Sequence, residues 1–510
     1  MDLPQTRNDP AAPAPCPGWA KGLFWGAVLF VYLFRMAYGV AFPWIYHTPV
    51  AGEYYYTVSA YEKGQGFEVR YMRSPAYPVF LLGVARTLGM EHLGMVQHTS
   101  LVMGVFLLGF LLTRIFPYVS GYMAAALFVL ACGFLPSHFV LASCMMAESV
   151  QSQVLALVVL CMYLWLREPL ARRAAILSVP VALALLLRPT NLVLLGAVVL
   201  VMAARRKKKA VVSMAVFTMV VFLCVLPWML ENTKLHGRFA LVQTTAEPLI
   251  QTYGHLIDMQ SAKNRPYKMA LRDNYNAYMA ARRNMTPDEL VWAGKKATWG
   301  EFSFLKKIAD TFHLEARQRD AVAIDLALEG IREHPWEVPA LLFQKLMVFY
   351  FSNPLDLERA FNEFPQRIPL IKFSALDKAF TFGCERPWCE TWDKNQQKSL
   401  VQKAGWVMAP VQRLVEPFAW GCLCVLWASI FFFPFALFGR HGLLGLFLFL
   451  FIHGYCVLVC LSMQPEYRYL EPVPFLAGFL LCLEALSAPE FFRKAGQVIP
   501  WTRPKIKTTP

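Results

Sequence analysis

The chain has 510 residues, of which 57% are hydrophobic and only 16% are charged, and its formal net charge is +15. A soluble protein of this size needs more charge, and the apolar residues here gather in runs near the ~20-residue length that crosses a bilayer. The positive charge lies between these runs and at the C-terminus, which is typical of an orientation signal and not of a nucleic-acid-binding surface. The composition predicts an all-α polytopic membrane protein with membrane lipids, and no nucleic acid, as partners.

The apolar runs predict about ten transmembrane helices. They lie at roughly residues 23–43, 99–113, 118–135, 146–166, 174–187, 190–204, 210–229, 415–437, 443–463 and 470–487. The chain therefore divides into a tail, an N-terminal membrane module, a long polar region, a C-terminal membrane module and a basic tail. These parts cover residues 1–22, 23–229, 230–414, 415–487 and 488–510.

The short loops predict the orientation, because cytoplasmic loops carry an excess of Lys and Arg. The clusters at residues 167–173, 205–209 and 488–510 fall on one side of the predicted spans, whereas the other side holds isolated arginines such as Arg188 and Arg468. Both termini are therefore predicted to be cytoplasmic. The first loop, residues 44–98, and the polar region, residues 230–414, are predicted to be external.

The long external region contains segments with helical composition, such as LRDNYNAYMAARRN. Its apolar stretch at residues 338–351 carries Lys345 and is too short to span a bilayer easily. We expect this stretch to form an interfacial helix that lies along the membrane surface. The region as a whole is about the size of a small domain, and we expect it to be mostly helical.

Two of the 12 cysteines differ from the others. Most lie in apolar runs, where a thiol behaves as a small hydrophobe, but Cys384 and Cys389 lie in the polar stretch CERPWC. If this stretch faces an oxidising compartment, the pair could form a disulfide. Metal binding is the weaker interpretation, since four ligands are usual and no second pair is close in sequence.

Glu53 is the first candidate for chemistry. It follows the first predicted span in the loop AGEYYYTVSAYEKGQGFEVRYMRSPAYPVF. A carboxylate at the water–lipid boundary can act as a general base on a hydroxyl while a lipid-bound donor stays in the membrane. The simpler interpretation is an ordinary solvated acid. Tyr54, Tyr55 and Tyr77 of the same loop are candidates for lining the substrate site.

Glu148 is the second candidate, at the predicted outer start of the apolar stretch ESVQSQVLALVV. An ionised carboxylate is costly in apolar surroundings, so such residues tend to be functional or paired. The simpler interpretation is an acid that the dipole favours at a helix N-terminus. The predicted topology places Glu148 and Glu53 on the same side and at similar depth.

Basic residues near the outer ends of the spans are candidates for holding a phosphate, because arginine binds phosphate through directional, charge-assisted hydrogen bonds. Arg73, Arg238 and Arg468 are the ones we select. For any one of them alone, the simpler interpretation is contact with lipid head groups.

Several segments, taken in order, resemble the GT-C class of membrane glycosyltransferases. The loop EYYYTVSAYEKGQGF…RSPAYPVF is similar to the first external loop of the dolichyl-phosphate-mannose protein mannosyltransferases and of the lipid A aminoarabinose transferase. MMAESVQSQVLALVVLCMYLWLRE, LLLRPTNLVLL and QPEYRYLEPVPFLAGFL also resemble segments of this family. The resemblance covers under half of the chain. Where relatives usually carry Asp, this chain has Glu53.

The resemblance implies inverting transfer of a sugar from a polyprenyl-phosphate donor to a lipid, glycan or protein acceptor at the outer face of the membrane. Glu53 would match the catalytic base and Glu148 the second acid, in a bacterial inner membrane with the site on the periplasmic side. No cofactor is required in principle, and a divalent metal stays open. The alternatives are a transporter or flippase, which would place charged sites near the bilayer midplane, and a polymerase or ligase of lipid-linked glycans.

Overall fold

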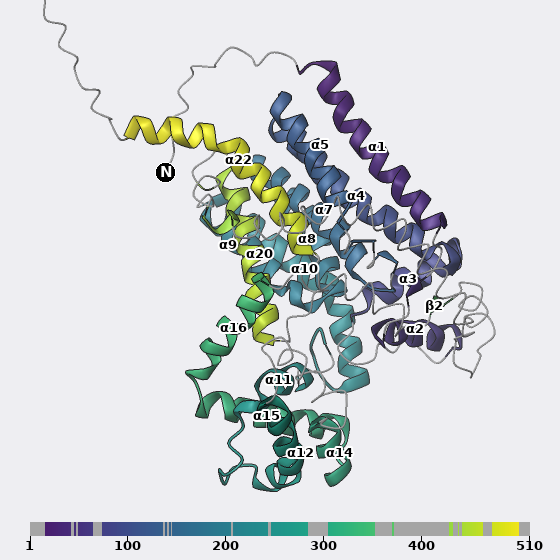
Figure 1. The fold of residues 1–510 in the computed structure, drawn as a ribbon, viewed down its shortest axis with the longest axis vertical. Helices are drawn as coiled ribbons and strands as arrows, with labels where there is room; N and C mark the ends of the chain where they lie inside the picture. The colour runs from purple at the N-terminus through teal and green to yellow at the C-terminus, as the bar shows by residue number, and fades with distance from the viewer. Residues whose placement is uncertain are drawn as a thin grey trace, which may run out of the picture.

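The structure is a computed structural model of the whole chain. It describes residues 16–41, 45–46, 49–64, 74–135, 138–139, 142–143, 145–205, 208–242, 246–283, 304–351, 370–371, 428–431, 437, 441–462 and 472–498. Nearly all of the described residues are helical (Figure 1).

The bundle consists of long apolar helices packed side by side (Figure 1). In chain order they are α1 (Gly18–Ala41), α4 (Leu93–Ile115), α5 (Val119–Gly133), α7 (Glu148–Arg167), α8 (Ala171–Leu187), α9 (Leu192–Ala204), α10 (Lys208–His236), α20 (Gly442–Ser462) and α22 (Pro472–Val498). Helices suit these sequences because a helix satisfies its backbone hydrogen bonds internally, as the interior of a bilayer requires.

Within the described part of the chain, nine of the predicted spans coincide with one of these helices. Five of them, α1, α4, α7, α10 and α20, are long and apolar enough to cross a membrane by length and composition, and α5, α9 and α22 contain shorter apolar stretches. The protein is therefore an integral membrane protein of the predicted all-helical kind. The tenth predicted span, residues 415–437, falls mostly outside the described residues, so the predicted count stays a prediction.

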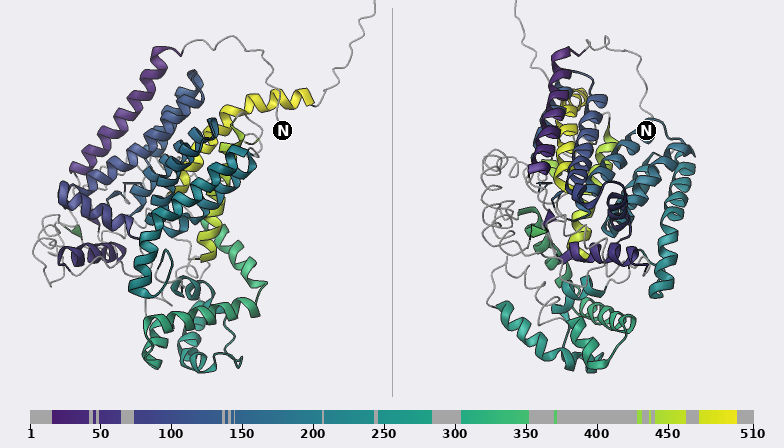
Figure 2. Two further views of the ribbon diagram at one scale, coloured as in Figure 1. Left: turned by 180° about the vertical axis from the view of Figure 1, so that it is seen from behind. Right: turned by 90° about the vertical axis from the view of Figure 1, so that its right-hand side faces the viewer.

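The ends of the bundle differ. The N-terminal end of α1 and the C-terminal end of α22 lie at one end, whereas helix α2 (Pro49–Glu62) and a separate group of short helices lie at the other (Figure 1). Helix α22 contains Pro489 and bends in its C-terminal part, as proline in a helix interior causes (Figure 2). This arrangement places both predicted external segments at one end of the bundle, which we call the outer end.

The first loop contains structure of its own. Helices α2 and α3 (Ala76–Thr87) pack against each other, and η1 (Met90–His92) leads into α4. Two short strands, β1 (Ile45–Tyr46) and β2 (Leu370–Ile371), pair antiparallel with Ile45 opposite Ile371. The strands join the first loop to a segment that follows the long external helices.

The described part of the predicted external region forms a small helical domain and one connecting helix. Its elements are α11 (Ala246–Tyr253), η3 (Gly254–Leu256), α12 (Arg265–Arg283), α14 (Phe304–Phe312), α15 (Ala316–Glu333) and α16 (Glu337–Phe351). A core around Ile250, Leu271, Ile308 and Leu326 holds α11, α12, α14 and α15 together. The segment LRDNYNAYMAARRN lies almost wholly in α12.

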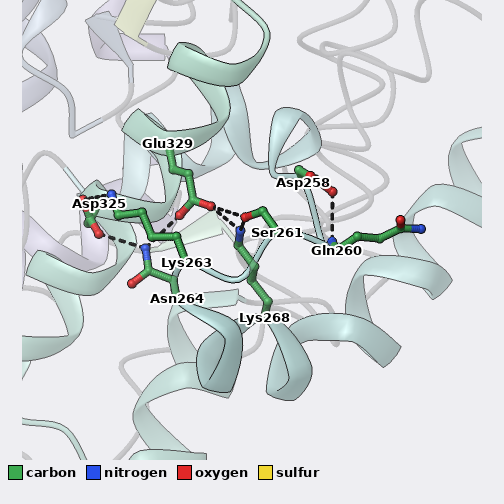
Figure 3. A network of polar contacts seen from close by, with 8 residues as sticks. All are labelled: Asp258, Gln260, Ser261, Lys263, Asn264, Lys268, Asp325 and Glu329. Carbon is green, nitrogen blue, oxygen red and sulfur yellow. Dashed lines mark hydrogen bonds and ion pairs between the residues drawn. The ribbon is translucent and has the colours of Figure 1, made fainter.

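A polar network holds α12 against α15 (Figure 3). Lys268 of α12 is 1% exposed and its Nζ donates hydrogen bonds to Glu329 of α15 and to Ser261. Asn264 Nδ2 bridges the two acids of α15, at 2.9 Å from Glu329 Oε2 and 2.8 Å from Asp325 Oδ2. Asn264 has a φ of 55°, a left-handed conformation that asparagine tolerates better than most residues.

The network lowers the pKa of both carboxyl groups. Burial acts to raise the pKa of Glu329, but hydrogen bonds from Lys268, Ser261 and Asn264, together with the charge of Lys268, outweigh burial and lower that pKa. Hydrogen bonds from Asn264 and then Lys263 lower the pKa of Asp325. Both carboxylates therefore contribute stability that is present at neutral pH.

We predict that the helical domain loosens at acid pH before the bundle does. A carboxyl whose pKa is lowered by folding stabilises the folded state above its unfolded pKa, and this stability is lost as the pH falls through the folded pKa. Hydrogen exchange of α12 and α15, corrected for the intrinsic rate, should therefore accelerate below the usual range of carboxyl pKa values. In Asp325→Asn/Glu329→Gln, the exchange should depend less on pH, and an unchanged dependence would contradict the assignment.

The orientation gives a second prediction. A single cysteine replacing Asp273, which is 87% exposed on α12, should react with a membrane-impermeant maleimide added to intact cells. A cysteine replacing the exposed Lys208, at the start of α10, should react only after the cells are opened, because basic loops stay in the cytoplasm. Labelling of Lys208→Cys in intact cells would reverse the orientation.

Candidate functional site

Polar side chains gather where helices meet at the outer end of the bundle. Arg35 Nε, near the end of α1, donates to Gly133 O at the end of α5, at 2.8 Å. Near the start of α4, Gln97 Nε2 donates to Ala142 O at 2.8 Å. Such side chains are expensive in a membrane helix unless they are paired. We call this set the outer polar layer; it consists of Arg35, Tyr77, Gln97, His98, Glu148, Gln151, Arg188 and Asn191.

Glu148 lies within this layer and is 1% exposed, in the first turn of α7. Arg188 Nη2 donates a hydrogen bond to Glu148 Oε1, and the Arg188 side chain is only 10% exposed. The other carboxylate oxygen of Glu148, Oε2, is buried without a hydrogen-bond partner among the described residues. Glu148 therefore forms a buried ion pair, and half of its carboxylate is left for another partner.

The local sequence explains how Arg188 reaches Glu148. Helix α8 ends at Leu187, and Arg188 adopts an extended conformation because the next residue is Pro189. The 3₁₀ turn η2 (Pro189–Asn191) then leads into α9. The segment RPTN thereby turns the arginine at the outer end of α8 towards the start of α7.

A second polar link lies one helical turn along α7. Gln151 Nε2 donates to Asn191 Oδ1 at 3.1 Å, and Asn191 Nδ2 donates to Ala184 O at 2.8 Å. Residues 148 and 151 share one face of the helix. The start of α7 is therefore fixed to the corner between α8 and α9 at two successive points, which restricts the position of the Glu148 carboxylate.

The tyrosines of the first loop connect α2 to the outer polar layer. Tyr54 of α2 and Tyr77 of α3 are 3% and 0% exposed, and their rings meet edge to face with centroids 4.7 Å apart. Tyr77 Oη donates to Gln97 Oε1 at 2.5 Å. We infer that these two rings hold α2 in place, and their predicted role in lining the substrate site stays a prediction.

The remaining predicted site residues are only partly described. Glu53 and Tyr55 lie in α2, but their side chains fall outside the described part of the chain. Arg73, Arg468 and the cysteine pair Cys384 and Cys389 lie outside the described residues altogether.

Arg238 is the predicted phosphate-binding arginine that the structure describes. It follows α10, and its Nη1 lies 3.7 Å from Asp320 Oδ2 of α15. Asp320 Oδ1 also accepts a hydrogen bond of 2.9 Å from Arg319 Nη2. Arg238 thus contacts the helical domain, at a distance too long for a direct hydrogen bond to that carboxylate oxygen.

Six residues of the layer were not selected as site residues from the sequence: Arg35, Gln97, His98, Gln151, Arg188 and Asn191. A lone arginine in an apolar run, such as Arg35, could have drawn attention. Arg35 is fully buried, lies 4.0 Å from the centroid of the Phe139 ring, and has Nη1 3.1 Å from His98 Nδ1. Because a guanidinium only donates, Nδ1 must accept this hydrogen bond. His98 therefore carries its proton on Nε2, which lies 3.4 Å from Ser143 Oγ.

No group of three or more His, Cys, Asp or Glu side chains suited to a metal ion occurs among the described residues. The layer instead combines one buried ion pair, amide and hydroxyl groups and a neutral imidazole. Such a set can hold hydroxyl groups and place a carboxylate at the outer boundary of the membrane.

No family model matches the chain, and no curated protein is significantly similar to it. Among solved structures, the chain is similar to two crystal structures of ArnT from Cupriavidus metallidurans, one bound to undecaprenyl phosphate and one in the apo state. Each has 14% identity and a TM-score of 0.36; the matches cover 95% and 94% of this chain and 80% of the ArnT chain in both cases.

ArnT is a GT-C lipid A aminoarabinose transferase, which is the class that the sequence segments resemble. A likeness of this degree carries no argument about the chemistry of the present chain. Its function must therefore be inferred from its own residues.

The buried ion pair gives a prediction about stability. Glu148→Leu or Arg188→Leu alone should lower the free energy of unfolding by about 3–5 kcal/mol, because each leaves an unpaired buried charge. The double variant should recover much of the loss. Thermal unfolding in detergent measures all three variants. The comparison is the Arg86–Glu62 pair, whose side chains are 59% and 29% exposed and which should contribute about 0–1 kcal/mol to the free energy of unfolding. Additive losses from Glu148 and Arg188 would show that the two charges do not depend on each other.

Proposed function

We propose that this chain is a membrane glycosyltransferase that moves a sugar from a polyprenyl-phosphate donor to an acceptor hydroxyl at the outer face of the membrane, with inversion. The observation that carries the proposal is the Glu148 carboxylate. Arg188 holds it at the outer end of the bundle, and its buried Oε2 has no hydrogen-bond partner among the described residues. The donor class comes from the resemblance of the sequence segments. We place the protein in a bacterial inner membrane with its site on the periplasmic side.

The reaction needs few groups from the protein. The acceptor oxygen forms a bond to the anomeric carbon of the sugar while the bond from that carbon to the phosphate oxygen breaks, and the phosphate leaves with the electron pair. A general base takes the proton of the acceptor hydroxyl. Cations stabilise the charge that develops on the departing phosphate. A single displacement of this kind inverts the anomeric centre.

Glu53 is the proposed general base. It precedes Tyr54 in α2, and the contact of Tyr54 with Tyr77, which is bonded to Gln97, ties this helix to the outer polar layer. A base must hold its position closely to be effective, so the packing of α2 on α3 is as important as the carboxylate itself. Glu53 therefore combines a boundary position with a rigid support.

Glu148 has a different proposed role. Its Oε1 is engaged by Arg188, so Oε2 is the oxygen that would accept a hydrogen bond from a sugar or acceptor hydroxyl. An unsatisfied buried acceptor costs about 1–3 kcal/mol, which a substrate hydroxyl would recover on binding. We assign Glu148 to positioning the substrate and Arg73, Arg238 and Arg468 to the phosphate.

The general-base role predicts the effect of Glu53→Gln. This variant keeps the size and hydrogen bonding of the side chain but loses its basicity, so transfer should fall by about 10²–10⁴-fold. Lipid and glycan profiling of cells that lack the protein would identify the donor and the product, and the variants would then be compared in those cells and in membranes. Donor binding should remain.

Glu62→Gln is the matched control, because Glu62 lies in the same helix, is exposed, and pairs with Arg86. Its transfer rate should stay near that of the parent protein. Near-normal transfer by Glu53→Gln, at equal protein amount, would remove the general-base assignment. A change in the face on which the lipid-linked sugar accumulates, without any new glycosidic bond, would instead favour a transporter.

A further inference from the structure

Helix α16 joins the external helical domain to the membrane bundle (Figure 1). Two of its faces are covered by protein. Val338 and Leu341 pack against the cluster formed by Tyr253, Leu256 and Ala327 of the domain. Leu342 and Leu346 pack instead against the core of the bundle. The helix is therefore wedged between the two parts.

Polar contacts show the depth at which this junction lies. Tyr253 Oη donates to Leu461 O at 2.8 Å, one residue before the outer end of α20. Lys345 of α16 is 4% exposed, and its Nζ lies 3.2 Å from Thr252 Oγ1. Since α20 is one of the helices able to cross a membrane, its end marks the boundary between lipid and water. Helix α16 lies at that boundary.

The third face of α16 is apolar, and none of the described residues covers it. Trp336, just before the helix, is 87% exposed and Phe343 is 63% exposed, with the exposed Pro339 and Ala340 between them. The spacing of three, four and seven residues places all four on one stripe of a helix. We call these four residues the α16 stripe. A tryptophan this exposed is unusual in water, because burying its ring removes a large apolar surface from contact with water.

We propose that the α16 stripe lies in the outer leaflet of the membrane and anchors the external domain to the lipid surface. The stripe is continuous with the bundle through Leu342 and Leu346. Tryptophan is enriched at membrane–water interfaces. A helix of 15 residues is about 22 Å long, which is too short to cross the bilayer but suits a position within the interface.

The charges along α16 agree with this placement. Arg332 and Glu333, at the end of α15, and Glu337, in the first turn of α16, are all exposed next to the domain. The part that approaches α20 is apolar apart from Gln344 and the buried Lys345. The N-terminal end, which carries Trp336, therefore suits the water-facing side of the interface, where tryptophan is enriched, and the other end suits lipid. The anchor fixes how far the external domain stands from the membrane, and it does not depend on the proposed function.

Photo-crosslinking tests the anchor directly. A benzoylphenylalanine replaces Trp336 or Phe343 in the full chain, held in nanodiscs of phosphatidylethanolamine and phosphatidylglycerol, and mass spectrometry identifies the captured molecule. Leu29, which is 56% exposed on α1, serves as the lipid-facing control, and Met269, which is 61% exposed on α12, as an apolar control in the domain. We expect lipid adducts at residues 29, 336 and 343 and none at 269.

Each other outcome counts against the proposal. Capture of another segment of the chain at residues 336 and 343 would show that protein covers the stripe, and capture of a second copy would make the stripe a dimer surface. Lipid capture at residue 29 alone would place the stripe in water. As a second measurement, Trp336→Glu/Phe343→Glu should accelerate hydrogen exchange in α16 while leaving α12 unchanged. Unchanged exchange in α16 would also overturn the anchor.

Discussion

The interior of a bilayer offers no water to polar groups, and the rest of the structure follows from that constraint. Helices satisfy the backbone internally, and a polar side chain that enters the bundle is costly unless it finds a hydrogen-bond partner. In the outer polar layer Arg35 bonds the end of α5 and His98, and Glu148 bonds Arg188. These bonds fix which helix ends meet, because each needs a partner from a separate segment. The outer polar layer is thus a structural joint, which holds helix ends together, in addition to being a candidate site.

Under the proposed function, the same joint also serves the site. A buried ion pair gains little stability over an apolar replacement, so its presence calls for another explanation. Here the pair leaves Glu148 Oε2 buried and without a hydrogen-bond partner in the described chain, a cost that a bound hydroxyl would recover. The link between Gln151 and Asn191, one turn along α7, restricts the position of the start of that helix. The rigidity that the membrane imposes is also what a positioning carboxylate requires.

The sequence predicted the parts of the structure that depend on local pattern. Apolar runs located the helices of the bundle, and a single acid in an apolar stretch drew attention to Glu148. Partners were not predictable, because they are remote: 63 positions separate Arg35 from His98, and 61 separate Lys268 from Glu329. Arg188 illustrates what the sequence does not predict. Both Arg188 and Glu148 were recognised as isolated charges on the same side of the membrane, but their pairing was not. Only the turn that Pro189 imposes after α8 shows that the two side chains meet.

Under the proposed function, the position of α2 must suit the base that this helix carries. Where the resembled family usually carries aspartate, Glu53 is longer by one methylene, so the same reach requires a helix set slightly further from the substrate. The contact of Tyr54 with Tyr77 and the bond from Tyr77 to Gln97 hold α2 in position. The pairing of β1 with β2 further ties the chain just before α2 to a segment far along the sequence. Small shifts in these contacts would move the whole helix, and the carboxylate with it. Under the proposed function, the identity of the acid and the packing of α2 must therefore be considered together.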